Sequence, residues 1–120
     1  MNRQILGIFF CFMVSGCSTR VSYAPSTLEA TNPKPSDFFI TLFQKNETVP
    51  SEYRTIGSVS VGDKWGMTVK CSYIDVINDA KDKARKVGGD AIQIVQMKEP
   101  SFSSTCYYLI ANVLTLESNN

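Results

Sequence analysis

Cysteine is the residue type in this sequence that offers the most chemistry. Four cysteines, Cys11, Cys17, Cys71 and Cys106, occur in 120 residues, and histidine is absent. A thiol can become a nucleophile, bind a metal ion, accept a lipid or form a disulfide. Histidine is the usual general base near neutral pH and the commonest metal ligand, and a nucleophile here would need Asp, Glu, Lys or Tyr as its base. We therefore expect no enzyme, no catalytic residues, no cofactor and no metal site.

The N-terminal segment has the pattern of an exported precursor. Arg3 is its one charged residue, and an apolar run follows at residues 5–14. A short cationic region before about 7–15 apolar residues is typical of a signal peptide. The run is also shorter than the roughly 20 residues of a transmembrane helix. The alternative interpretation is a buried hydrophobic segment of the folded protein.

The end of this segment, residues 14–17 (VSGC), resembles the lipobox of bacterial lipoprotein precursors. The resemblance implies removal of residues 1–16 as a signal peptide and attachment of a diacylglycerol to the Cys17 thiol. A triacylated cysteine carries enough chain methylenes, at about 0.8 kcal/mol each, for stable anchoring. Ser18 follows, and in Gram-negative lipoproteins this implies sorting to the outer membrane. The expected location is therefore the cell envelope, with lipid on Cys17 as the link to the membrane.

Two thiols would remain in the exported chain. Cys11 leaves with the signal peptide and Cys17 is acylated, so Cys71 and Cys106 are left. In an oxidising compartment, such a pair indicates one structural disulfide. It would close a loop of about 35 residues, for which the chain-entropy estimate is roughly 4 kcal/mol of stabilisation. The alternative is a redox or metal-responsive pair, although the C-x-x-C motif of redox proteins is absent.

The charge balance argues against nucleic acid as a partner. Lys and Arg total 12, Asp and Glu total 11, and loss of Arg3 makes the two numbers equal at 11. A nucleic-acid-binding domain generally carries a basic patch or stripe. The 104 residues left after removal of residues 1–16 suit one domain with a tail.

The remaining chain divides into a linker and a domain. Residues 17–36 form the lipid anchor and a Ser/Thr/Pro-rich segment without a hydrophobic period, which predicts a flexible linker. This linker either carries the domain away from the membrane or is a tail with no spacing role. Residues 37–117 are expected to form a single α+β domain.

Hydrophobic patterns within this domain predict the order β-β-α-β-β. Strands are expected at 37–43, 53–61, 90–98 and 105–116, with one helix at 72–87 and a loop containing Trp65 at 63–70. Ser72 and Asp75 indicate a capping box, and Gly88 with Gly89 indicates the helix C-cap. The predicted buried face of the helix has helical spacing and consists of Ile74, Ile77, Ala80, Ala84 and Val87.

These elements predict a small sheet with one helix packed on one face, braced by one disulfide between the helix entrance and the last strand. The last strand is apolar on both sides, with Ile110 and Leu114 on one and Leu109 and Val113 on the other. The second sheet face is therefore expected to be covered, and a second copy of the chain in a homo-oligomer is one candidate.

The domain also resembles small lipoprotein domains of bacterial envelope proteins. The motifs that carry this resemblance are Tyr-x-x-Ile-Gly-x-Val at 53–59, Cys71, Ala80 with Ala84, Gly-Gly-Asp-Ala-Ile at 88–92, Pro100 and Cys106. More distantly, it is similar to the outer-membrane sensor lipoprotein of the Rcs envelope-stress pathway, which has two disulfides where this chain can form one. The helix and GGDAI are also similar to a family of small domains described as heavy-metal-binding.

The resemblance implies an anchored, disulfide-braced domain that contacts partner proteins. The leading prediction is a non-enzymatic envelope lipoprotein acting by protein–protein contact, in envelope sensing or in a structural role. The alternative is a redox or metal-responsive module that uses Cys71 and Cys106.

Overall fold

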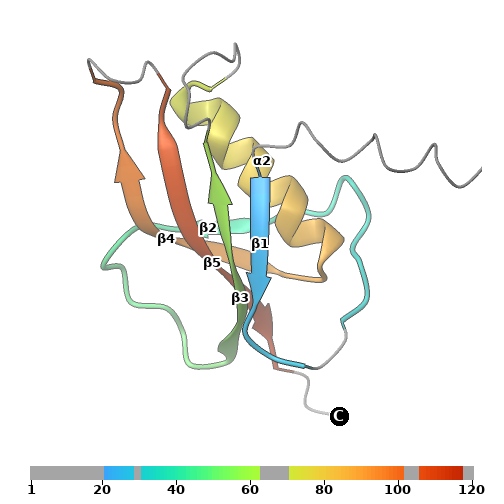
Figure 1. Ribbon diagram of the computed structural model, residues 1–120. Helices are drawn as coiled ribbons and strands as arrows, with labels where there is room; N and C mark the ends of the chain where they lie inside the picture. Colours follow the sequence, from blue (N-terminus) through green and yellow to red (C-terminus); the bar gives the residue numbers. More distant parts are fainter. Residues whose placement is uncertain (1–20, 29–30, 63–70, 102–105, 118–120) are drawn as a thin grey trace, which may run out of the picture.

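The computed structural model describes residues 21–28, 31–62, 71–101 and 106–117. The predicted signal peptide, Cys17 and Trp65 lie outside these residues. The described elements are shown in Figure 1: β1 (Val21–Pro25), β2 (Thr41–Phe43), β3 (Tyr53–Val61), α2 (Tyr73–Lys86), β4 (Ala91–Lys98) and β5 (Tyr108–Leu116).

The five strands form one sheet in the order β1-β3-β5-β4-β2. Neighbouring strands are antiparallel except β2 and β4, which are parallel. Helix α2 packs across one face of this sheet (Figure 1). The predicted α+β fold, with one helix on one face, is confirmed, and the sheet has one strand more than the sequence predicted.

The additional strand, β1, lies inside the segment predicted as a flexible linker, and for these residues that prediction is wrong. β1 pairs antiparallel with β3 along its whole length. The ring of Tyr23 lies over Gly57, where any side chain would overlap it. The Tyr23 hydroxyl also donates a hydrogen bond to the Ile56 carbonyl at 3.1 Å. Burial raises the pKa of Tyr23, because the charged form is disfavoured away from water.

Residues 31–38 lie against the C-terminal end of α2. The Thr31 hydroxyl donates to the Val87 carbonyl, and the Lys34 amide donates to the Arg85 carbonyl at 2.8 Å. In return, Nε of Arg85 donates to the Phe38 carbonyl at 2.7 Å. The first two bonds occupy carbonyls at the helix end, where intrahelical donors are lacking. All three attach the segment to the domain.

The first predicted strand, at 37–43, is shorter than expected. Only Thr41–Phe43 pair with β4, which itself begins at Ala91 opposite Thr41. Earlier in this run, the Phe38 carbonyl accepts a hydrogen bond from Arg85. Phe39 is 76% exposed, and the ammonium of Lys81 lies 5.9 Å from its ring centre. The apolar composition of this run therefore reflects partial packing on the helix as well as strand formation.

Both predicted caps of α2 are confirmed. The Ser72 hydroxyl accepts from the Asp75 amide at 3.2 Å, and the Asp75 carboxylate accepts from the Ser72 amide at 3.0 Å. At the other end, Gly88 has a φ of +90°, which glycine adopts without a steric cost. The Gly89 amide donates to the Ala84 carbonyl at 2.7 Å, completing a Schellman motif.

The buried face of α2 is rotated from the predicted one. Ala80 and Ala84 are fully buried as expected, which lets the helix lie close to the sheet, but Val76 is also fully buried. Ile74 is 58% exposed, so its predicted burial is wrong. Successive residues are about 100° apart around the helix axis. Viewed along that axis, the centre of the buried face lies between the directions of Val76 and Ala84, and Ile74 points to one side of it.

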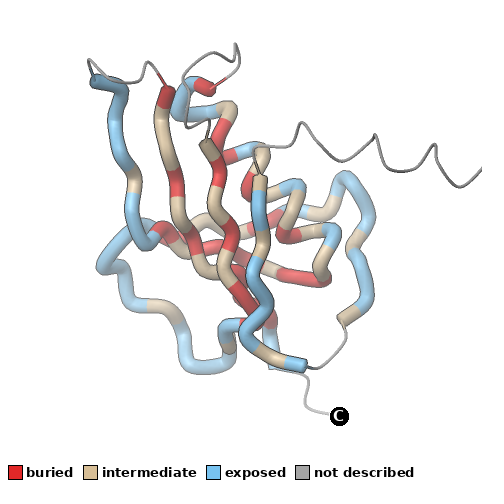
Figure 2. The backbone as a smooth tube through the Cα atoms, viewed as in Figure 1, coloured by how far each residue is buried: buried red, intermediate tan, exposed pale blue. Residues whose placement is uncertain are grey.

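The core occupies both faces of the sheet. The larger cluster lies between α2 and the sheet and includes Ile56, Val59, Ile92, Leu109 and Val113 (Figure 2). A smaller cluster lies on the opposite face, because alternate strand residues point to opposite sides. It contains Phe43, Ala91 and Leu114, with Val49 and Tyr53 packed against it.

The chain itself contributes to covering this second face. The Gln93 side-chain amide donates to the carbonyls of Gln44 and Glu47, at 3.2 and 2.9 Å, and so holds the β2–β3 loop over the sheet. Around Leu114, the predicted cover is therefore part of the same chain. A homo-oligomer remains a prediction.

Candidate functional site

The predicted disulfide between Cys71 and Cys106 is present. The two Cα atoms are 5.0 Å apart, within the usual range for a disulfide, and both residues are buried. The Tyr107 amide donates to the Cys71 carbonyl at 3.1 Å. The start of α2 and the start of β5 are thus joined by a covalent bond and a backbone hydrogen bond. With both sulfurs bonded, neither cysteine presents a thiolate for nucleophilic attack or metal binding.

An apolar surface lies directly beside the disulfide. The rings of Tyr73 and Tyr107 meet edge to face, with centroids 5.8 Å apart, a favourable geometry for two aromatic rings. Tyr73 is 38% exposed and Ile74 is 58% exposed. We call these three residues, Tyr73, Ile74 and Tyr107, the disulfide-end patch.

The chain also enters the fold at this end of the domain. Figure 1 shows the start of β1, the start of α2 and the start of β5 at the same end of the sheet. Val21, the first residue of β1, lies four positions after Cys17. Cys17 is outside the described residues, so its lipidation remains a prediction.

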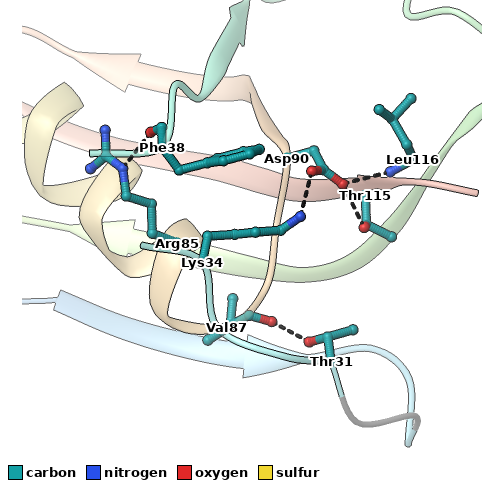
Figure 3. A network of polar contacts seen from close by, with 8 residues as sticks. All are labelled: Thr31, Lys34, Phe38, Arg85, Val87, Asp90, Thr115 and Leu116. Atoms are coloured by element: carbon teal, nitrogen blue, oxygen red, sulfur yellow. Dashed lines mark hydrogen bonds and ion pairs between the residues drawn. The ribbon is translucent and has the colours of Figure 1, made fainter. Parts of the chain in front are cut away.

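A polar network occupies the opposite end (Figure 3). The carboxylate of Asp90 accepts from the Lys34 ammonium at 2.7 Å, the Thr115 hydroxyl at 2.8 Å and the Leu116 amide at 2.9 Å. Lys34 also lies 4.6 Å from the centre of the Phe38 ring, where cation–π attraction is favourable. The network joins the segment after β1 to the turn after α2 and the end of β5.

The surroundings of Asp90 favour its charged form. Burial alone would raise the pKa of Asp90, but hydrogen bonds from Lys34, Leu116 and Thr115, together with the charge of Lys34, lower it below the ordinary value. A lowered pKa in the folded state stabilises the fold above the unfolded pKa, and this contribution is lost as the pH falls through the folded pKa. The contribution of this network to the stability of the fold therefore depends on the ionised form of Asp90.

Replacement of Asp90 by Asn should lower stability at neutral pH and flatten its acid dependence. The unfolding free energies of wild type and Asp90→Asn, measured with urea, should differ by about 1–3 kcal/mol at pH 7. This difference should shrink below about pH 4, where the unfolded Asp is protonated. Asp37→Asn, at an exposed position, is the matched control. A difference that stayed constant down to acid pH would contradict this account of Asp90.

The described residues contain neither a candidate metal cluster nor a helix that could span a membrane. Across 21–28, 31–62, 71–101 and 106–117, there is no group of three or more His, Cys, Asp or Glu that could hold a metal ion. Over the same residues, no helix has the length and apolar character to cross a membrane.

No protein-family model and no curated protein matches the chain. Among solved structures, the Francisella virulence factor FvfA, in an orthorhombic crystal form, is similar to it with a TM-score of 0.51. The match covers 81% of this chain and 97% of FvfA, at 13% identity. At that identity, the likeness shows a related fold alone.

The sequence predicted the disulfide correctly. It did not predict the exposed patch beside the disulfide or the polar network around Asp90. Lys34 and Asp90 are 56 residues apart, and no local pattern connects them. Ile74 and Ile77 have helical spacing, so the sequence pattern predicted that both side chains are buried. One usable signal for the network was Asp90 itself, a charged residue directly before the apolar run of β4.

Proposed function

We propose that this protein is a lipid-anchored bacterial envelope lipoprotein that acts without catalysis, by contact with other proteins. The observation that carries the proposal is the N-terminal pattern: one cation, a ten-residue apolar run at 5–14, and VSGC at 14–17. The Cys71–Cys106 disulfide supports it, because disulfides persist in exported proteins and are rare in the cytosol. The outer membrane is the proposed location, on the basis of Ser18.

Intact mass of the protein extracted from bacterial membranes tests the anchor. The wild-type chain should lack residues 1–16 and carry diacylglycerol and acyl groups on Cys17. It should also gain two hydrogens on reduction of the disulfide. Cys17→Ser removes the thiol needed for the thioether, so this variant should be neither lipidated nor processed at that position.

A matched control is available in the same segment. Cys11→Ser changes a cysteine that the proposed cleavage discards, so the mature mass of this variant should equal that of wild type. A wild-type chain that is unmodified at Cys17, or a Cys17→Ser variant that is still lipidated, would refute the anchor.

The outer edge of β4 supports contact with another protein. β2 pairs only with Ala91–Gln93, so among the described residues no strand pairs with the outer edge from Ile94 to Lys98. Val95 on this edge is 40% exposed, and Figure 2 shows the distal part of β4 largely exposed. Free edges can accept an extended segment from a partner. Crosslinking from position 95 in intact cells, compared with position 37, should capture a specific envelope protein.

The redox alternative has a direct test. A redox-active pair would be reduced and reoxidised in glutathione buffers near the potential of the compartment, whereas structural disulfides are far more resistant. The buried positions of Cys71 and Cys106 favour the structural role. Thiol titration of the native protein should therefore detect no reactive cysteine until the chain is unfolded and reduced.

A further inference from the structure

We propose that the disulfide-end patch rests on the phospholipid surface, with Tyr73 and Ile74 at the boundary between headgroups and acyl chains. This inference rests on the proposed lipidation of Cys17. It adds an orientation: the domain would lie directly on the bilayer, with the polar Asp90 network directed away from it.

The length of chain before β1 carries the proposal. Val21 lies four positions after Cys17, and an extended chain spans at most about 3.3–3.6 Å per residue. The anchored cysteine is therefore within about 14 Å of the sheet. Val21 and the other residues of β1 are fixed by pairing with β3, so they add no further reach. A domain held this closely cannot move far from the membrane.

The sheet register places the patch at the anchored end. Val21 pairs with Val61, and Val61 pairs with Leu109 on β5. With about 4.8 Å between neighbouring strands, the start of β1 lies about 10 Å from β5. Cys106 lies three positions before Leu109, and its bond to Cys71 holds the first turn of α2 at the same end.

The exposed side chains of the patch suit a membrane interface. Tyrosine is enriched at this depth, because its ring is apolar and its hydroxyl is polar. Ile74, 58% exposed, supplies aliphatic surface next to it. Other exposed apolar side chains, such as Phe39 and Leu116, lie away from the start of β1 and serve as internal references.

The short tether makes a weak contact effective. Two apolar side chains bind a bilayer poorly by themselves, but a tether converts docking into an intramolecular step at high effective concentration. The expected contact is therefore present in the lipidated protein and lost when the same domain is released from its lipid. It needs no basic patch, which is consistent with the balanced charge of the chain.

Depth-dependent quenching tests this orientation. Ile74→Cys and Phe39→Cys each place a single reactive thiol on the lipidated full chain, since Cys17 is acylated and Cys71 is bonded to Cys106. Each variant is labelled with an environment-sensitive fluorophore and reconstituted into phosphatidylcholine vesicles that contain nitroxide lipids. Lipid quenching at position 74 should be several-fold stronger than at position 39, and a long Gly/Ser insertion between residues 20 and 21 should reduce it.

The outcomes separate this proposal from the proposed function. Intact mass is measured on the same samples, and absence of lipid on Cys17 would refute the anchor itself. A lipidated chain with equal quenching at positions 74 and 39 would refute the docking while leaving the anchor intact. Stronger quenching at position 39 would refute the docking and show that the surface around Phe39 faces the membrane instead.

Discussion

Replacing both Cys71 and Cys106 by alanine is expected to lower the free energy of unfolding by about 4 kcal/mol, from the chain-entropy estimate for a loop of this length. The bond spans 35 residues that include α2 and β4. Without it, the unfolded chain gains freedom while the contacts of α2 with the sheet remain. Urea unfolding of a chain that begins at residue 18 and is folded under oxidising conditions measures the effect.

Reduction of the wild-type disulfide provides an independent comparison. The reduced wild type and the double alanine variant should unfold at nearly the same urea concentration, because both lack the loop constraint. A loss of less than about 1 kcal/mol in the variant, a typical value for an ordinary point substitution, would show that the bond contributes little to the fold. The disulfide would then need a role other than stability.

Leu109→Ala is expected to destabilise the protein by about 2–5 kcal/mol. Leu109 has no exposed surface and belongs to the cluster between α2 and the sheet. Removing most of its side chain loses burial of apolar surface and leaves a cavity that a close-packed core fills only partly. Urea unfolding measures this loss on the same chain as the disulfide variants.

The same strand offers a matched control for this substitution. Leu116, the last residue of β5, is 46% exposed, so Leu116→Ala makes the same chemical change with much less burial. Its cost should be below about 1 kcal/mol. Equal losses for the two variants would contradict the assignment of Leu109 to the buried cluster between α2 and the sheet.

The parts of the fold that the sequence predicted are those with strong local signals. The helix has a capping box at Ser72 and a glycine cap at Gly88, and both act within one helical turn of their partners. β3 was predicted with its observed bounds, Tyr53–Val61, because a stretch that contains Thr, Ile and Val ends at Gly62. The Cys71–Cys106 bond followed from the number of cysteines left in an exported chain.

The parts that could not be predicted depend on contacts between distant residues. β1 is a short strand of mixed polarity, and its stability comes from pairing with β3 and from Tyr23 packed over Gly57. β2 is short because its partner β4 begins only at Ala91, opposite Thr41. Lipidation of Cys17 and the interactions of the domain belong to chemistry outside the described residues, so these remain proposals.

The pairing of β1 with β3 also determines how the fold would respond to tension. In a chain held by Cys17, a pulling force enters through the hydrogen bonds between β1 and β3, since β1 is the first described element after the anchor. The disulfide links residues 71 and 106, and the loop that it closes does not include β1. It therefore does not hold β1 in place. Release of residues 21–40 would lengthen the tether by up to about 70 Å, at a rate set by the local unfolding barrier. The segment between the anchor and β2 would then be a tether that is short while β1 is paired with β3 and that extends under force.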